Sequence, residues 1–173
     1  ETVYAFCRAT DDLVDNDEAI PSNVERLAKW RRELESSLDG ASSYPLLNQL
    51  HAIAKRFNIP VVHFYELLRG VEMDLVKHRY ETFEELVEYC KLVASSVGLM
   101  CLGIFGAKSE RAKEYAVQLG IALQLTNIIR DVGIDGKYGR IYLPLEDLRR
   151  FKCAESDLLA GVYSASFQQL MEF

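Results

Sequence analysis

The sequence predicts an all-α fold, on three observations. Apolar residues recur at the three- and four-residue spacing of amphipathic helices through most of the 173-residue chain. No segment shows the strict apolar-polar alternation that is typical of a half-buried strand. Hydrophobic residues make up 49% of the chain and charged residues 27%, which is enough apolar material for one sizeable core. We therefore expect a single helical domain over residues 1–173.

Caps, glycines and prolines set the expected helix boundaries. The first helix ends before the polar, proline-bearing stretch "NDEAIPSN", the second stops at Gly40 and the third before Pro60. The fifth opens with Thr82 and Glu85 in capping-box spacing. The predicted helices are 1–13, 23–38, 44–58, 61–78, 82–106 and 109–132, followed by a glycine-rich break at 133–144 and by short helices.

The two longest predicted helices follow one another in the middle of the chain. A short turn joins 82–106 to 109–132, so we expect these helices to lie antiparallel, side by side. The uncharged run 92–107 falls short of the roughly 20 residues of a membrane-spanning helix, and we interpret it as a buried helix. Gly70 marks a candidate break within 61–78.

Composition excludes some partners and compartments. The net charge of −6 and the lack of a basic stripe argue against nucleic-acid binding. The cysteines are scattered without a C-x-x-C pair, which favours free thiols in a reducing, intracellular compartment: Cys7, Cys90, Cys101 and Cys153. The chain opens at Glu1 without a methionine and stops at Phe173 inside a helical pattern, so we expect a domain truncated at both ends.

A polar stripe runs along the first predicted helix. Its members lie at offsets of 0, 4, 7 and 11 residues, the spacing of one helical face: Tyr4, Arg8, Asp11 and Asp15. Two carboxylates four residues apart repel each other mildly when nothing offsets their charge. Apolar neighbours such as Phe6 and Leu13 indicate that the stripe faces a cavity.

A second polar stripe lies far downstream, at offsets of 0, 3, 7 and 11: Gln124, Asn127, Asp131 and Asp135. Its neighbours, such as Ile121 and Ile128, are strongly apolar. Buried amides and carboxylates need partners, because each unpaired polar group costs roughly 1–3 kcal/mol. Two such stripes facing each other would meet that need by sharing cations.

The two stripes together predict a Mg²⁺-diphosphate site. Mg²⁺ is usually held by one or two carboxylates, several waters and substrate phosphate oxygens. Arg8 and Arg130 adjoin the carboxylates, and guanidinium groups match phosphate oxygens bidentately. Lys137, Tyr138 and Arg140 are candidates to close over the same anion. Either stripe alone is more typical of a solvated helix face, and it is the combination that favours the site.

Small residues give the middle helices an unusually thin profile: Val93, Ala94, Val97 and Gly98 on one, and Ala116, Leu119 and Gly120 on the next. Taken alone, this pattern indicates close helix packing. Below a diphosphate site, the same residues would leave room for a long hydrocarbon chain.

Other chemistries lack a motif. The histidines show no zinc or di-iron spacing: His51, His63 and His78. No dinucleotide fingerprint, Walker loop or nucleophile elbow is present.

At these residues the chain resembles the squalene/phytoene synthase family, the head-to-head trans-prenyltransferases. "YAFCRATDDLVD" is similar to the first aspartate motif of the family, and "QLTNIIRDVGIDGKYGRIYLP" to its second. "YETFEELVEYCKLVASSVGLM" is similar to the stretch that shapes the hydrocarbon tunnel. The resemblance covers the whole chain and implies an isoprenoid-synthase-type helical bundle with a central cavity.

The resemblance also implies residue roles. Metal ligands would be Asp11, Asp15, Asn127, Asp131 and Asp135. Contacts to diphosphate or to the reacting carbons would come from Tyr4, Arg8, Gln124 and Arg130, with Tyr89 near the chemistry. The small residues Val93, Ala94, Val97, Gly98, Ala116, Leu119 and Gly120 would line the hydrocarbon tail. Two positions depart from the family pattern: Ile134 replaces a common acidic residue, and "ASSVG" replaces "AGTVG", where Ser95 would narrow the tunnel.

The implied activity is condensation of two prenyl diphosphates through a cyclopropylcarbinyl diphosphate, with Mg²⁺ or Mn²⁺ as cofactor and NADPH dependence left open. "GVEMDL" and "GRIYLPLEDLRRF" are slightly more similar to bacterial presqualene diphosphate enzymes, which favours farnesyl over geranylgeranyl diphosphate. The alternatives are a non-catalytic assembly protein of the same fold, which would not need the motif aspartates, and a head-to-tail or cyclising enzyme, whose D-D-x-x-D motifs are absent. We expect a cytoplasmic or peripheral-membrane protein, with a plastid left open, and the oligomeric state is not predicted.

Overall fold

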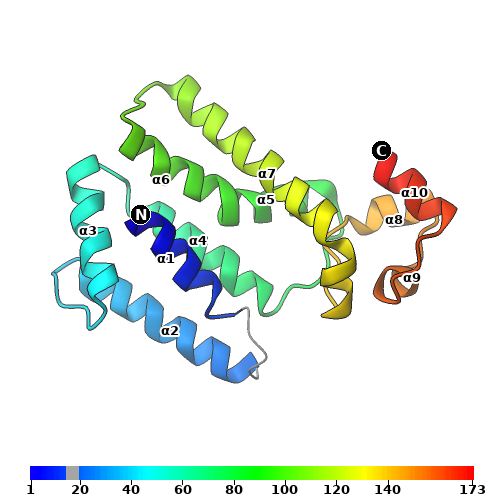
Figure 1. Cartoon of the computed structure of the whole chain (residues 1–173), viewed down its shortest axis with the longest axis horizontal. Coiled ribbons are helices and arrows are strands. Elements are labelled where there is room, and N and C mark those ends of the chain that lie inside the picture. The colour runs from blue at the N-terminus through cyan, green and yellow to red at the C-terminus, as the bar shows by residue number, and fades with distance from the viewer. Residues whose placement is uncertain (15–19) are drawn as a thin grey trace.

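The chain folds as a set of helices, which confirms the all-α prediction. The structure is a computed structural model that describes residues 1–14 and 20–173, and those two ranges contain no strand (Figure 1). The helices are α1 (Thr2–Asp11), α2 (Ile20–Ser37), α3 (Pro45–Phe57), α4 (Val62–Asp74), α5 (Phe83–Cys90), the π-helical segment η1 (Lys91–Ser95), α6 (Ser96–Phe105), α7 (Glu110–Lys137), α8 (Leu145–Phe151), α9 (Glu155–Leu159) and α10 (Ala165–Glu172).

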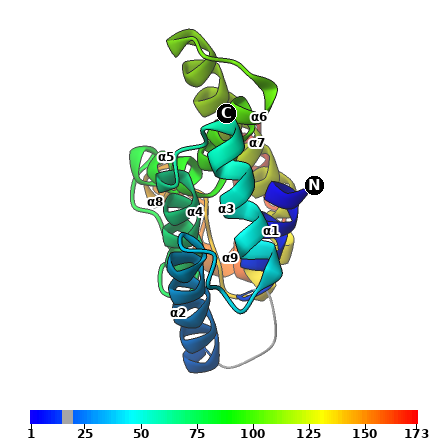
Figure 2. The ribbon, with the colours of Figure 1, turned by 90° about the vertical axis from the view of Figure 1, so that its left-hand side faces the viewer.

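The helices pack around two neighbouring cores. Helix α1 contacts α3, α4 and α6, while α2 covers α3 and α4. Helices α6 and α7 form the predicted antiparallel pair, and the loop between them extends beyond its neighbours in both views (Figures 1 and 2). At the other end of α7, α9 packs against it and α10 packs on α8. Helix α7 therefore links the two halves of the structure.

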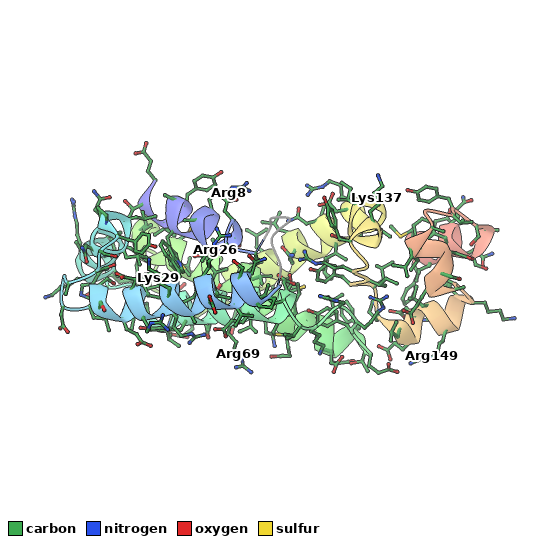
Figure 3. The ribbon with its side chains drawn as sticks, turned by 90° about the horizontal axis from the view of Figure 1, so that it is seen from below. Arg8, Arg26, Lys29, Arg69, Lys137 and Arg149 are labelled. Carbon is green, nitrogen blue, oxygen red and sulfur yellow. The ribbon has the colours of Figure 1, made fainter. Side chains whose placement is uncertain are left out.

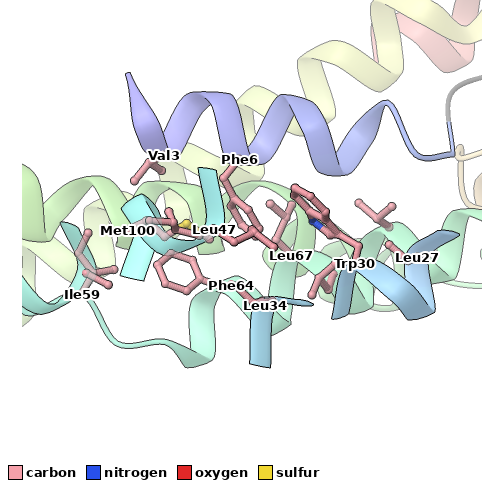
Figure 4. Close-up of a cluster of buried hydrophobic side chains, with 14 of the residues drawn as sticks. Val3, Phe6, Leu27, Trp30, Leu34, Leu47, Ile59, Phe64, Leu67 and Met100 are labelled. Carbon is pink, nitrogen blue, oxygen red and sulfur yellow. The ribbon is translucent and has the colours of Figure 1, made fainter. Parts of the chain in front are cut away.

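The first core fixes α1 on α2 and α4 (Figure 4). The Phe6 ring stacks on Trp30 with centroids 6.3 Å apart and meets Phe64 edge-on at 5.4 Å. Thr10, which is fully buried, accepts a hydrogen bond from Trp30 Nε1 at 3.0 Å and donates to the Phe6 carbonyl at 2.8 Å. These contacts hold the end of α1, where Asp11 lies.

The second core contains three tyrosines in mutual contact. Tyr80, Tyr89 and Tyr142 lie with ring centroids 5.4 to 5.8 Å apart. Ile128 of α7 and Leu148 of α8 pack into the same cluster. The segment between α7 and α8 joins it as well, since the Ile141 amide donates to the His78 carbonyl at 3.1 Å. The end of α7 is thereby tied to the segment that precedes α5.

Two glycine predictions were wrong. Gly70 does not break its helix, because α4 runs through it to Asp74. Helix α7 continues past the predicted end at residue 132, through Gly136 to Lys137. Both glycines are sites of close packing: a Cβ on Gly70 would lie 2.5 Å from Val93 Cγ1, and a Cβ on Gly136 would lie 2.8 Å from the Leu158 carbonyl oxygen.

The predicted helix 82–106 is one helical run with a π-helical turn in its middle. Among the described residues, the run Phe83–Phe105 alone has the length and apolar composition of a membrane-spanning helix. The run packs against α4 and α7 and buries Ser95, Ser96 and Met100, but most of the residues from 91 to 105 are only partly buried or exposed, unlike the buried helix we predicted. At its end, Phe105 is 79% exposed.

Candidate functional site

A cavity of about 570 Å³ lies between the two cores. Helices α1, α4, α5 and α7, the segment η1 and the segment after α7 all contribute to its wall. The lining residues are Asp11, Val14, Val71, Asp74, Tyr89, Val93, Gln124, Asn127, Ile128, Asp131, Ile134, Asp135, Tyr138, Arg140 and Tyr142. Its volume falls in the range of small-molecule sites.

The α7 stripe reaches the cavity in full. Gln124, Asn127, Asp131 and Asp135 all line it, as their helical spacing predicts. Asp135 is on this face because α7 remains helical to Lys137. Had the helix ended at residue 132, the position of Asp135 would have depended on a loop.

The α1 stripe reaches the cavity only at its end. Asp11 lines the cavity, whereas Tyr4 is 75% exposed and Arg8 forms an ion pair with Asp12 at 2.9 Å. Neither Tyr4 nor Arg8 is among the lining residues. Asp15 lies outside the described residues. The structure therefore brings Asp11 together with the α7 stripe, and the substrate contacts expected of Tyr4 and Arg8 stay predictions.

Arg130 pairs with its own neighbour. Its Nε donates to Asp131 Oδ1 at 2.8 Å and its Nη2 to Oδ2 at 2.6 Å. These hydrogen bonds from the guanidinium lower the pKa of Asp131 below its ordinary value and raise that of Arg130. Arg130 itself does not line the cavity. A diphosphate contact from Arg130 stays a prediction.

Two tyrosines and an aspartate close one wall. The Tyr89 hydroxyl donates to Asp74 Oδ2 at 2.9 Å, and the Tyr142 hydroxyl donates to Asp74 Oδ1 at 2.8 Å. Burial, with Asp74 next in effect, raises the pKa of both phenols well above the ordinary value. Both hydroxyls therefore stay protonated and act as donors. Tyr89 thus lies on the cavity wall, and its place near the chemistry stays a prediction.

Sequence reasoning missed Asp74 and Tyr142. Asp74 stands four residues after Gly70, beside the apolar Val71 and Leu75. A carboxylate in that apolar setting is a signal that could have identified it. Tyr142 had no local signal, because its partner is 68 residues away in the chain.

The segment after α7 supplies two of its three predicted residues. Tyr138 and Arg140 line the cavity. Lys137 is exposed and absent from the lining, and it extends from the same edge of the molecule as Arg8 (Figure 3). Arg140 is therefore the cation of this segment that could face an anion in the cavity.

The small residues mostly serve helix packing. A Cβ on Gly120 would lie 2.7 Å from Ser95 Cα, and a Cβ on Gly98 would lie 3.0 Å from the Ala116 carbonyl oxygen. Leu119 is 60% exposed. Among the seven small residues predicted to line a hydrocarbon tail, Val93 lines the cavity, and a tail-lining role for the other six stays a prediction.

The oxygen donors of the cavity fit a hard divalent cation. Asp11, Asn127, Asp131 and Asp135 offer carboxylate and amide oxygens from two sides. Within residues 1–14 and 20–173, no three His, Cys, Asp or Glu side chains gather closely enough to hold a metal ion. That donor set suits an ion such as Mg²⁺, which keeps waters and takes substrate oxygens.

Comparisons with known proteins give matches over nearly the whole chain. The family model described as squalene/phytoene synthase matches residues 2–173. Phytoene synthase of Arthrospira platensis is 41% identical over 99% of this chain and 60% of its own length, and 15-cis-phytoene synthase of Synechocystis sp. is 41% identical over 99% and 54%.

Two solved structures have the same fold. The squalene synthase HpnC from Alicyclobacillus acidocaldarius matches with a TM-score of 0.88 and 31% identity, over 98% of this chain and 64% of that one. A dehydrosqualene synthase crystallised with a ligand matches with a TM-score of 0.84 and 37% identity. This match covers 99% of this chain and 59% of the dehydrosqualene synthase chain. The chain thus spans a little over half the length of these relatives.

Proposed function

Because the chain belongs to the squalene/phytoene synthase family, we propose that the protein joins two prenyl diphosphates head to head through a cyclopropylcarbinyl diphosphate and releases diphosphate. The observation that carries the proposal is that Gln124, Asn127, Asp131 and Asp135 share one cavity wall with Asp11 nearby. The named relatives are synthases, so the non-catalytic alternative gains no support.

The polar part of the cavity is suited to the diphosphate end. Asp11, Asn127, Asp131 and Asp135 would hold Mg²⁺ or Mn²⁺ through their oxygens. A bound divalent cation supplies positive charge that offsets the charge of a departing diphosphate. Arg140 is placed to add a permanent positive charge at the same wall.

The apolar part of the cavity is suited to the carbon chain and to a carbocation. Val71, Val93 and Ile128 supply aliphatic surface, and Tyr89 and Tyr142 supply aromatic rings. Such a wall excludes water, which would otherwise trap an allylic cation as an alcohol. Aromatic faces also attract positive charge, by about 0.5–2 kcal/mol per ring.

The comparisons support a proposal for the length of the prenyl chain that differs from the one the sequence favoured. The sequence alone favoured a presqualene-type enzyme that uses farnesyl diphosphate. The curated relatives at 36–41% identity are named phytoene synthases, and the matched squalene and dehydrosqualene synthase structures are 31% and 37% identical. We therefore propose a phytoene-type product, made from geranylgeranyl diphosphate.

A product assay tests both the proposed prenyltransferase activity and the proposed length of the prenyl substrate. Full-length protein is incubated with Mg²⁺ and labelled farnesyl or geranylgeranyl diphosphate, with and without NADPH, and the products are identified. We expect a C40 product from geranylgeranyl diphosphate, lost when EDTA removes the metal. A C30 product alone would overturn the chain length, and no C30 or C40 product from folded protein would overturn the enzyme.

The place of the protein in the cell follows from the same chemistry. We propose an intracellular protein that touches a membrane peripherally, because a C40 hydrocarbon product is insoluble in water. Exposed Phe105 and Ile104, at the C-terminal end of α6, support the proposal. Co-sedimentation with phosphatidylcholine vesicles tests it: Phe105→Ser should reduce the bound fraction, and equal binding would contradict this contact.

A further inference from the structure

Asp74 holds two tyrosines of the cavity wall at once. It is the last residue of α4, and each of its carboxylate oxygens accepts one phenol hydrogen bond, from Tyr89 on α5 and from Tyr142 after α7. All three residues line the cavity. One carboxylate therefore joins three separate chain segments at the wall where the carbon chains would lie.

We propose, on the basis of the proposed function, that Asp74 is a positioning residue that orients Tyr89 and Tyr142 to stabilise a carbocation in the cavity. Because each hydroxyl hydrogen is directed at Asp74, a lone pair on each phenol oxygen stays free to face other groups. The rings themselves are held at 5.4 Å between centroids. The hydrogen bonds to Asp74 thus increase the negative charge on the phenol oxygens of these two cavity-lining tyrosines.

The hydrogen bonds also shield the carboxylate. A bare carboxylate beside an allylic cation is a nucleophile, and attack would form an ester bond to the enzyme and end the reaction. With each oxygen accepting a phenol hydrogen bond, the negative charge remains near the cation while the two hydrogen bonds lower the nucleophilicity of the carboxylate. This arrangement gives electrostatic stabilisation without capture of the substrate.

Stability alone does not account for Asp74. A carboxylate at the C-terminal end of a helix faces the negative end of the helix dipole, which is electrostatically unfavourable. The second core also tolerates an unpaired phenol: the Tyr80 hydroxyl is buried and has no hydrogen-bond partner within the described structure. Tyr80 lies in the same ring cluster and is absent from the cavity lining. It is therefore a matched control for Tyr89 and Tyr142.

The test compares Asp74→Asn with Tyr80→Phe in the full-length protein. Asn can accept one phenol hydrogen bond and must donate to the other phenol, so one hydroxyl hydrogen has to turn away from residue 74. We expect Asp74→Asn to lower kcat by roughly tenfold to a hundredfold with KM little changed, since displaced catalytic groups cost about that much. Tyr80→Phe should keep the wild-type kcat. A kcat for Asp74→Asn within twofold of wild type would overturn the proposal.

A second variant and a spectroscopic measurement separate positioning from folding. The double variant Tyr89→Phe/Tyr142→Phe keeps the rings and removes the same two hydrogen bonds, and adding Asp74→Asn to it should lower kcat no further. Additive losses would overturn the proposal. In ¹³C-tyrosine NMR spectra, Asp74→Asn should shift the Cζ signals of Tyr89 and Tyr142 and leave Tyr80 in place. Unshifted signals would overturn the contact itself, whether or not the protein proves to be a prenyltransferase.

Discussion

Gly120 of α7 lies directly against Ser95 of η1, so closely that a Cβ on the glycine would be 2.7 Å from the serine Cα. The contact is reinforced by a hydrogen bond of 2.8 Å from Ser95 Oγ to the Val117 carbonyl. On its opposite side, η1 packs against Gly70 of α4 through Val93. The π-helical turn is thus held between two helices that both line the cavity.

Gly120→Ala should destabilise the protein. The added methyl group would meet backbone atoms, which cannot rotate away, and overpacking of this kind costs about 1–3 kcal/mol. Gly133→Ala on the same helix is the control, because its methyl group would meet only the Tyr163 hydroxyl at the end of a flexible side chain. Thermal unfolding should show a lower Tm for the first variant and an unchanged or higher Tm for the second. Equal Tm values for Gly120→Ala and Gly133→Ala would contradict this prediction, because they would mean that α7 can move away from η1 without loss of stability.

Helix α3 was predictable because it buries a single face, which carries Leu47, Leu50 and Ala54. Helix α3 was expected over 44–58 and spans Pro45–Phe57, ended by Asn58 in the left-handed conformation. The continuation of α7 to Lys137 could not be predicted from the local sequence. Gly136 has the appearance of a helix breaker in the sequence, yet its missing side chain admits the Leu158 carbonyl. Whether a glycine ends a helix or accepts a neighbour depends on tertiary packing.

The site was predictable to the extent that one helix carries it. The α7 stripe follows from periodicity alone, and all four of its members line the cavity. The group of Asp74, Tyr89 and Tyr142 comes from three segments, so no local spacing encodes it. Arg130 was expected to contact a diphosphate, but its Nε and Nη2 donate to the neighbouring Asp131, and this pairing depends on side-chain conformations that residue spacing does not specify.

Thr10→Val should destabilise the first core. Valine matches threonine in shape but leaves the buried Trp30 Nε1 without its acceptor, and an unsatisfied buried donor costs about 1–3 kcal/mol. Thr126→Val is the matched control, because Thr126 is exposed and its hydroxyl bonds only to the Ala122 carbonyl of its own helix. Urea denaturation should show a lower midpoint for Thr10→Val alone. A shift of the same size in both variants would refute the role of the Trp30 hydrogen bond.

Ionisation of Glu33 should make the stability of the folded protein depend on pH in the acid range. Hydrogen bonds from the Ser42 and Ser43 hydroxyls and from the Ser43 amide lower the pKa of Glu33 below its ordinary 4.5. Because the folded pKa is the lower one, this contribution is present above pH 4.5 and disappears as pH falls through the folded value. The Tm difference between wild type and Glu33→Gln should therefore be largest near neutral pH and shrink below pH 4.5. Glu35→Gln, an exposed carboxylate on the same helix, serves as the control, and a Glu33→Gln difference that persists in acid would contradict the linkage.

Asp11→Ala and Asp131→Ala should each abolish product formation while leaving helicity intact. Both carboxylates line the cavity, Asp11 from α1 and Asp131 from α7, so removal of either takes an oxygen ligand from the proposed cation without opening a core. Asp12→Ala is the control on α1, because Asp12 follows Asp11 in sequence but turns to Arg8 on the surface. Circular dichroism and a Mg²⁺-dependent product assay on the three variants decide the matter. If Asp11→Ala or Asp131→Ala turns over substrate as fast as Asp12→Ala, the substituted aspartate is not a ligand of the metal site. Raising the Mg²⁺ concentration should restore activity to neither variant if its missing carboxylate is an essential ligand.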